Sequence, residues 1–354
     1  MNAADPDWAE RALGAVIDRV GVTAEQVGER FPLFADPDGG RWTTSARGSW
    51  TGGFWAGLLW LRALVTGDLA DRTAARECTR RLAGWVDQDA AVRGMILWYG
   101  TALADGTGAG LRERAARRCL AAFEPAFGVV PWGGAFGGPR LLARADGVPG
   151  LVPLLARSGE AGLAAARAHL TLHLELCLAE EPPRPAWAAL PGGGWRGCDE
   201  PEPGWSRTVG WLLLGVADAL AVPGLDRDGA VAEASRRLAA LRLGTAAAPV
   251  PVLAGGLLDT SAAAIEAVAA LKLAALAGTA EEREQLAVRA RVVLRGLCER
   301  HLTSAGGSRP AGMLLDGCYD VRRGLAVRHE LVWGDFFLAF GLAVLTGLVG
   351  PFAA

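Results

Sequence analysis

Residues 50 to 68 read WTGGFWAGLLWLRALVTGD, with Arg62 as the only charge before the final aspartate. A helix over this stretch is apolar on every side, so other helices must enclose it. Gly67 is suited to end the helix, and Asp68 is suited to cap the next one. The stretch therefore predicts an inner helix that the rest of the chain surrounds.

The segment that follows, at roughly 69 to 87, is amphipathic instead. Arg72, Arg76 and Arg80 fall on one helical face, and small or apolar residues fall on the other. An enclosed helix, a glycine turn and a half-exposed helix thus form one unit, and the rest of the chain repeats it.

Charge-poor segments predict six inner helices, at roughly 50 to 66, 91 to 104, 146 to 158, 205 to 221, 259 to 277 and 331 to 347. Amphipathic segments alternate with them and predict six outer helices, at roughly 7 to 20, 69 to 87, 109 to 124, 160 to 180, 226 to 243 and 280 to 301. Because helical hairpins repeat without a strand pattern, we expect an all-α fold, an (α/α)6 barrel, as a single domain over residues 1 to 354.

Short turns follow the inner helices, whereas long segments rich in proline, glycine and tryptophan precede most of them. These long segments cover residues 32 to 49, 125 to 145, 182 to 204, 244 to 258 and 303 to 329. The long loops and the N-termini of the inner helices should therefore meet at one end of the barrel. We expect the functional site there, because loops on a rigid scaffold carry many sites and helix N-termini favour anions.

The net charge of −2 gives no field that would attract nucleic acid or an anionic membrane, so neither is an expected partner. The six cysteines are scattered without a CxxC pair, which indicates free thiols in a reducing compartment. The first residues, MNAADPDWAE, do not have the apolar core of a secretory signal. Asp335 and several glycines interrupt the apolar run from 331 to 350, which favours a buried helix over a membrane span. We therefore expect a cytoplasmic protein.

Tryptophans, carboxylates and arginines recur at the starts of the inner helices and in the loops before them. Flat indole rings stack on the apolar faces of sugars, and charged groups bind sugar hydroxyls and acids. This combination predicts a site for a small carbohydrate or glycoside. The residues expected to bind it are Trp42, Trp50, Asp89, Arg93, Trp132, Trp205, Arg207, Asp259, His329, Trp333 and Asp335.

Three aspartates at the starts of inner helices have a second interpretation. Asp146, Asp259 and Asp335 each stand where an aspartate also serves as an N-cap. Asp259, which precedes Thr-Ser and an alanine-rich stretch, fits a cap best. Tryptophans well inside the predicted helices, such as Trp60 and Trp211, are expected to be core residues.

Neither a metal nor a cofactor is expected. His169 and His173 have the i,i+4 spacing of a metal-binding helix, but they fall on an outer helix far from the predicted mouth, with no glutamate between them. The glycine runs at 52–53 and 192–194 lack the strand and the lysine that a phosphate-binding loop requires.

Several stretches are each similar to a motif of known enzymes. The opening stretch matches W-T-x-G-F-W-x-G-x-L-W-L…T-G-D, and GWSRTVGW at 204–211 is similar to W-x-R-G-Q-A-W. DTSAAAIEAVAAL at 259–271 is similar to D-S-S-A-x-A-I, and ADGVPGLVPLLARSGE at 145–160 to D-T-M-M-N-L-P-L-L-x-W-A. Over roughly 40 to 350 the chain thus resembles the unsaturated glucuronyl hydrolases and unsaturated rhamnogalacturonyl hydrolases, glycoside hydrolase families 88 and 105.

The resemblance implies an (α/α)6 barrel enzyme that removes a 4,5-unsaturated uronic acid from the non-reducing end of a small oligosaccharide. In these families one aspartate protonates the enol-ether double bond and then activates the water that adds at C5. The resulting hemiketal collapses and releases the aglycone, without the oxocarbenium route of ordinary glycosidases. The resemblance places this aspartate at Asp146 and implies that Arg207 or Arg93 binds the substrate carboxylate. The tryptophans expected to stack on the sugar ring are Trp50, Trp132 and Trp205.

The chain departs from the families' pattern at polar positions. Their H-D-x-G-F motif aligns with AVRGM, which puts Ala91 and Val92 where a histidine and a second aspartate are expected, and Val209 replaces a glutamine. Asp89 or Arg93 would have to replace the lost groups. Two other functions therefore stay open. One is a pseudoenzyme that binds a sugar or a partner through the same tryptophans, and the other is a barrel recruited to tailoring or cyclisation of a natural product.

Overall fold

The computed structural model describes residues 7–225, 229–244 and 246–354, and two kinds of helix alternate along them. The start of the helix predicted at 226 lies outside the described residues. The inner helices are α2 (Gly52–Thr66), α4 (Arg93–Tyr99), α6 (Leu151–Ala156), α8 (Thr208–Leu220), α10 (Thr260–Leu276) and α12 (Val332–Leu345). The outer helices are α1 (Trp8–Val27), α3 (Leu69–Arg81), α5 (Gly106–Ala121), α7 (Gly159–Cys177), α9 (Gly229–Arg242) and α11 (Ala280–Arg300). The prediction of a mostly helical chain is confirmed.

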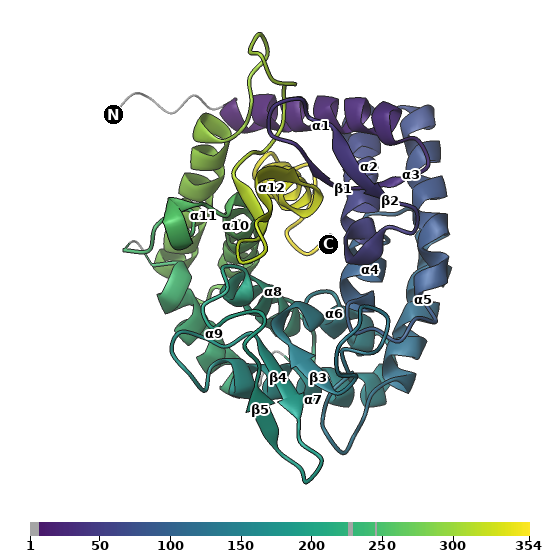
Figure 1. Cartoon of the computed structure of the whole chain (residues 1–354), viewed down its shortest axis with the longest axis vertical. Helices are drawn as coiled ribbons and strands as arrows, with labels where there is room; N and C mark the ends of the chain where they lie inside the picture. The colour runs from purple at the N-terminus through teal and green to yellow at the C-terminus, as the bar shows by residue number, and fades with distance from the viewer. Residues whose placement is uncertain (1–6, 226–228, 245) are drawn as a thin grey trace.

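The inner helices form a closed ring. Each contacts the next one in chain order, from α2 to α12, and α12 contacts α2 again. Each outer helix packs on one or two inner helices, so that a second ring surrounds the first (Figure 1). The alternation of apolar and amphipathic segments in the sequence thus corresponds to inner and outer positions in the molecule.

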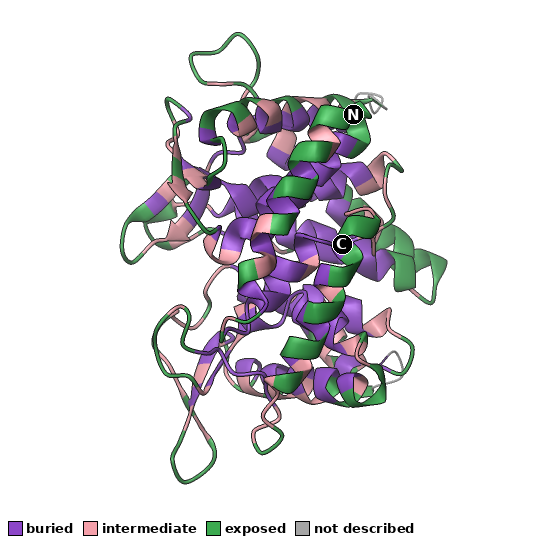
Figure 2. Ribbon diagram, turned by 90° about the vertical axis from the view of Figure 1, so that its right-hand side faces the viewer, coloured by how far each residue is buried: buried purple, intermediate pink, exposed green. Residues whose placement is uncertain are grey.

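Burial distinguishes the two rings. In α10 every residue from Thr260 to Ala274 is buried, whereas in α3 only Ala75, Cys78 and Thr79 are. Figure 2 shows the same contrast, with buried residues in the interior and exposed residues on the outer helices and loops. The apolar segment near the C-terminus is one of the inner helices, α12, with 14 residues. No helix in the described ranges combines the length and the apolar composition needed to cross a membrane.

Aromatic side chains fill the centre of the inner ring. The Phe54 ring lies 5.0 Å from the Tyr99 ring, 5.5 Å from Phe336 and 5.4 Å from Phe337, measured between centroids. Trp211 packs at 6.4 Å on the same phenylalanine and also forms part of the floor of the cavity described below. Because these aromatic side chains are fully buried and close-packed, the ring of inner helices encloses a packed core.

The expectation that the chain has no strands is wrong, because the long loops pair with one another. One antiparallel sheet has the order β2-β1-β7-β6 and the other has the order β3-β4-β5. The first consists of β1 (Phe31–Ala35), β2 (Trp42–Ser45), β6 (Gly317–Asp320) and β7 (Leu325–Leu331). The second consists of β3 (Leu142–Arg144), β4 (Ala186–Ala189) and β5 (Trp195–Gly197). Phe34 pairs with Leu331, so the first sheet joins loops from opposite ends of the chain.

Two inner helices are shorter than the sequence predicts. The segment before α6 forms a separate 3₁₀ turn, η3 (Ala145–Gly147), and Gly150 then adopts a left-handed conformation with φ of 70°. Asp146 therefore lies in a turn ahead of the helix and does not cap it. Similarly, the segment predicted to be helical from residue 91 becomes α-helical only at Arg93.

The crossing of α2 and α4 depends on a glycine, which gives a stability prediction. A Cβ atom at Gly53 would overlap the carbonyl oxygens of Met95 and Ile96. Gly53→Ala should therefore lower the free energy of unfolding by roughly 1–3 kcal/mol or more, because α2 would have to move away from α4. Gly14→Ala is the matched control, because a Cβ there has no atom within 4 Å.

In helix α1 this control should leave the free energy of unfolding unchanged or raise it by up to about 1 kcal/mol, since alanine loses less backbone entropy than glycine on folding. Urea denaturation of the two variants measures the difference. Equal stability of both variants would contradict the packing described here.

Candidate active site

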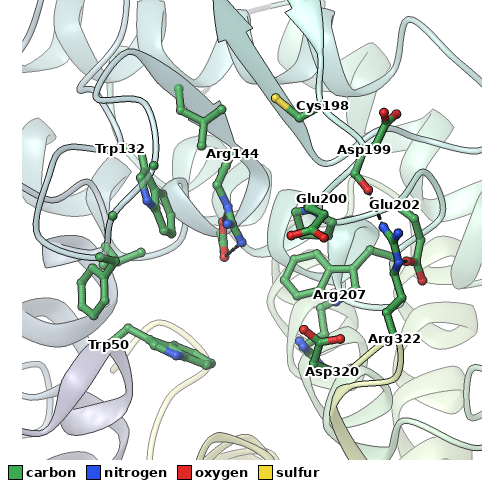
Figure 3. A pocket seen from close by; sticks show the side chains of 18 of the residues that line it. Trp50, Trp132, Arg144, Cys198, Asp199, Glu200, Glu202, Arg207, Asp320 and Arg322 are labelled. Carbon is green, nitrogen blue, oxygen red and sulfur yellow. Dashed lines mark hydrogen bonds and ion pairs between the residues drawn. The ribbon is translucent and has the colours of Figure 1, made fainter. Parts of the chain in front are cut away.

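A cavity of about 720 Å³ opens at the end of the ring where the long loops gather. Four of the segments that lead into inner helices contribute to its lining, through Trp50, Val92, Asp146 and Arg207. The prediction that the N-termini of all inner helices meet at one mouth is thus confirmed for α2, α4, α6 and α8, whereas the starts of α10 and α12 do not line the cavity. Figure 3 shows the side chains converging on the open space.

Tryptophans form two walls of the cavity. Trp50 is fixed by a hydrogen bond from its Nε1 to the hydroxyl of Tyr319, at 2.8 Å, and packs 4.8 Å from the Trp333 ring. Trp132 lies on another side of the cavity, and Trp205 lines it beside Arg207. All three of these cavity tryptophans were expected at the site from the sequence, and the structure brings them together.

Asp146 lies at the cavity in an ion pair with Arg144. The Nε of Arg144 donates to Oδ1 at 2.9 Å and its Nη2 donates to Oδ2 at 2.8 Å. Both side chains stay partly accessible, at 22% for Arg144 and 15% for Asp146. The guanidinium carbon of Arg144 lies 4.2 Å from the Trp132 ring, which holds the arginine from one face. The two parallel hydrogen bonds from the planar guanidinium of Arg144 hold the Asp146 carboxylate in one orientation.

His169 supports the turn that carries Asp146. Its Nδ1 accepts a hydrogen bond from the backbone N–H of Val130 at 3.1 Å, so the ring proton is on Nε2, which donates to the carbonyl of Gly147 at 3.3 Å. One neutral ring therefore joins the loop before Trp132 to the turn of Asp146. The expectation that this histidine lies far from the mouth is wrong, since it contacts the residue next to Asp146.

Arg207 lines the cavity, and both terminal nitrogens of its guanidinium donate to protein atoms, while its Nε is buried without a partner in the described part of the chain. Nη1 donates to Asp259 at 2.7 Å and to the carbonyl of Cys318 at 2.5 Å, and Nη2 donates to the carbonyl of Tyr319 at 2.8 Å. The group lies 4.6 Å from the Trp205 ring and 5.6 Å from the Trp333 ring. Since Arg207 is only 3% exposed, these contacts make it an anchor for the cavity wall.

An acidic segment forms the wall opposite Trp132. Asp199, Glu200 and Glu202 precede α8 and face Arg322 and Arg323 in the turn between β6 and β7 (Figure 3). Glu200 lies 3.2 Å from Arg323 and Glu202 lies 3.5 Å from Arg322. All four side chains are at least 40% exposed, so these pairs are worth little energetically. They join two loops across the rim.

Two of the expected binding residues, Arg93 and Asp89, do not reach the cavity. Arg93 is buried and donates to the carbonyls of Val86 and Ala90, so it cannot bind a substrate carboxylate or replace a lost polar group. Asp89 accepts from the N–H of Gly134 and from Arg140, both at 3.1 Å. It therefore holds the following loop in place from outside the cavity lining.

Trp42, Asp335 and His329 also lie away from the cavity. Trp42 donates to Thr23 at 3.1 Å, and Asp335 is buried in the same region, where burial raises the pKa of its carboxyl well above the usual value. His329 donates from Nδ1 to the carbonyl of Val327 at 2.7 Å and packs on Phe34. None of the three lines the cavity.

Asp259 and Trp333 form a second layer behind the cavity wall. The side chain of Asp259 accepts from the N–H of Ala262 at 3.3 Å and so caps α10, as its alternative interpretation predicted, while also pairing with Arg207. Trp333 is fully buried beneath Trp50. Asp259 therefore affects the cavity through Arg207, and Trp333 affects it through Trp50.

Several residues of the lining were not predicted from the sequence. Arg144 was not expected at the site, because the strand and turn that pair it with Asp146 are not visible in a helical pattern. The acidic run DEPE at 199–202 is separated from the GWSR stretch by Pro203 alone, so its position before an inner helix was a usable signal. Tyr319 and Asp320, at the end of β6, also line the cavity.

Among the described residues, no group of three or more histidine, cysteine, aspartate or glutamate side chains could hold a metal ion. Those described include His169 and His173, whose rings lie 4.2 Å apart. His173 donates from Nδ1 to the carbonyl of His169 at 2.7 Å. The pair therefore stabilises its own helix and the turn beside it.

The structure resembles solved structures of unsaturated glucuronyl hydrolases. The enzyme of Bacillus sp. GL1, described as responsible for the degradation of glycosaminoglycan, is 22% identical with a TM-score of 0.81, over 95% of this chain and 96% of that chain. One described as specific for heparin is 17% identical with a TM-score of 0.82, over 96% and 97%. The Streptococcus agalactiae enzyme is 16% identical with a TM-score of 0.80, over 99% and 94%. No family model and no curated protein matches the sequence. The chain thus has the fold of the unsaturated glucuronyl hydrolases.

The buried histidines behind Asp146 give a prediction about the pH dependence of stability. Burial, followed by the neighbouring imidazole, lowers the pKa of His169 well below 6.5, and burial lowers the pKa of His173 to about 4. The native state thus keeps both rings neutral, while the unfolded chain binds protons below about pH 6.5. Their contribution to stability is full above that pH and is lost as the pH falls towards 4.

Buried carboxyls act in the opposite direction in the same range. Burial raises the pKa of Glu266 to about 7 and that of Glu330 to about 6. The measurement is therefore the difference in urea stability between the wild type and the His169→Gln/His173→Gln variant, taken at pH 7 and near pH 5. The wild type should lose on the order of 2–4 kcal/mol more than the variant between these two conditions. If both proteins lost the same free energy of unfolding between pH 7 and pH 5, the histidines would not be the cause of the pH dependence.

Proposed function

We propose that the chain is a glycoside hydrolase that removes an unsaturated uronic acid, or a related sugar, from the non-reducing end of a small glycoside. The single observation that carries the proposal is Asp146, which faces a tryptophan-walled cavity in a fold shared with unsaturated glucuronyl hydrolases. The neighbours described as acting on glycosaminoglycan and heparin support a small carbohydrate as the substrate class.

In the proposed reaction Asp146 is the catalytic residue. Its carboxyl donates a proton to C4 of the enol ether, and the resulting carboxylate takes a proton from the water whose oxygen bonds to C5. The hemiketal then opens and the aglycone leaves, so Asp146 ends the cycle protonated as it began. Each oxygen of Asp146 accepts one hydrogen bond from Arg144 in this structure, which leaves a second lone pair on each oxygen to carry the proton.

The tryptophans would position the sugar. Trp50, Trp132 and Trp205 line the cavity, and their flat faces suit the apolar faces of a pyranose ring. Val92 makes one side of the lining apolar where the related families have an aspartate. We therefore expect fewer polar contacts to the sugar hydroxyls than in those families.

The wider assignment is part of the same proposal. We assign the double ring of helices as an (α/α)6 barrel that forms one domain over residues 1 to 354, within glycoside hydrolase families 88 and 105. A cytoplasmic location is supported by the six cysteines, all of which are free thiols. Neither nucleic acid nor a membrane is proposed as a partner.

A second candidate function is a pseudoenzyme that binds a sugar without turning it over. The specific observation in its favour is the bidentate Arg144–Asp146 pair, which occupies both oxygens of the proposed acid. Binding of an unsaturated uronide by the wild type, with no loss of the ultraviolet absorbance of the C4=C5 bond, would support this candidate over hydrolysis.

Replacement of Asp146 tests the catalytic assignment. Asp146→Asn should reduce kcat by roughly 10²- to 10⁴-fold, because asparagine supplies no proton but still accepts a hydrogen bond from Arg144. The loss of C4=C5 absorbance in an unsaturated uronyl disaccharide measures turnover. Asp87→Asn is the matched control, since Asp87 is 68% exposed and pairs with Arg118 on the outer surface. Equal turnover by the Asp146 variant and the control would remove Asp146 from the mechanism.

A further inference from the structure

Arg144 differs from the other three arginines that line the cavity. The guanidinium of Arg207 has three acceptors, including Asp259. Arg322 pairs with Glu202 and donates to a backbone carbonyl, and Arg323 pairs with Glu200 and Asp320. Arg144 makes its hydrogen bonds to Asp146 alone, through Nε and Nη2.

The remaining edge of the Arg144 guanidinium is available to a ligand. A guanidinium has five N–H groups in one plane, and Asp146 uses one on Nε and one on Nη2. Nη1 has no hydrogen-bond partner among the described residues, so the edge formed by Nη1 and the second N–H of Nη2 is free. Figure 3 shows Arg144 reaching into the cavity between Trp132 and the acidic segment.

The surroundings hold this edge in one orientation. The Trp132 ring covers one face of the guanidinium at 4.2 Å, and Asp146 fixes the plane through two hydrogen bonds. A donor pair that is fixed before binding loses little conformational entropy when it takes a carboxylate. The two arginines at the rim are less suited than Arg144 to bind a carboxylate, because their side chains are largely in solvent. Arg322 is 53% exposed and Arg323 is 68% exposed.

We propose that Arg144 is the specificity-determining residue, and that it binds the carboxylate of an acidic sugar through its free edge while Asp146 stays on the opposite edge. The proposal rests on the function proposed above and names the residue that selects uronides. It replaces Arg93, which lies outside the cavity lining, and Arg207, whose Nη1 and Nη2 donate to protein atoms and whose Nε is buried.

The geometry connects binding to the reaction. In a 4,5-unsaturated uronide the carboxylate is attached to C5, one end of the double bond that is hydrated. A carboxylate on one edge of Arg144 therefore brings C4 and C5 close to Asp146 on the other edge.

The test compares a ligand with its uncharged counterpart. The dissociation constants of an unsaturated uronyl disaccharide and of its methyl ester are measured by calorimetry, with the wild type and with Arg144→Gln. The wild type should bind the acid about 10- to 100-fold more tightly than the ester, because bidentate charge-assisted hydrogen bonds are lost in the ester. In Arg144→Gln the ratio should fall to about 1. The control Arg295→Gln, on the outer face of α11, should keep the wild-type ratio.

A more conservative variant guards against misfolding. Arg144→Lys keeps the charge but not the planar fork, so its ratio should lie between those of the wild type and Arg144→Gln. Circular dichroism and the thermal midpoint establish that each variant is folded. Equal binding of acid and ester by the wild type, no measurable binding of either, or an unchanged ratio in Arg144→Gln would each overturn the proposal.

The outcomes also separate this proposal from the proposed function. A wild type that prefers the acid, loses this preference in Arg144→Gln and never consumes the C4=C5 bond would leave Arg144 as the carboxylate site of a binding protein. Conversely, equal turnover of acid and ester by the wild type and by Arg144→Gln would support hydrolysis and refute the role of Arg144.

Discussion

The enclosure of the inner helices determines where chemistry takes place in this molecule. Every residue of α10 from Thr260 to Ala274 is buried, so a charge within it must find a partner in a neighbouring helix. Glu266 pairs with Arg242 at 2.8 Å, and Lys272, the one lysine of the chain, pairs with Asp218 at 2.6 Å. The cavity lies beyond the ends of these helices, where Asp146 and Arg144 stay partly accessible.

One of these buried pairs also organises the loops around the cavity. Arg207 precedes α8, its partner Asp259 caps α10, and the carbonyls that Arg207 bonds belong to β6. The guanidinium thus joins two inner helices and one sheet at a single buried point. Its removal would leave the buried Asp259 carboxylate without its cation, which is costly at such a site. This structural role explains why a residue that the family resemblance assigns to the substrate is not free to bind one.

The sequence predicted the helices well because enclosure and exposure leave opposite patterns in composition. It predicted the polar site less well for physical reasons that differ between residues. Arg93 stands at the start of an inner helix, as a ligand-binding residue would, but its side chain turns back to the carbonyls of Val86 and Ala90. The strands were missed because β3 and β5 are three residues long and pair only within the folded loops. No local pattern records partners as distant as Phe34 and Leu331.

The immediate surroundings of Asp146 show how its charge is balanced at the cavity. A Cβ at Gly147 would lie 3.2 Å from the Cβ of Ala91, so one side of the turn packs on an apolar side chain that cannot balance a charge. Arg144, at the end of β3, supplies the cation through two hydrogen bonds. Because the cation and the carboxylate are two residues apart in the chain, the short strand and the 3₁₀ turn that follows it bring both groups to the cavity together.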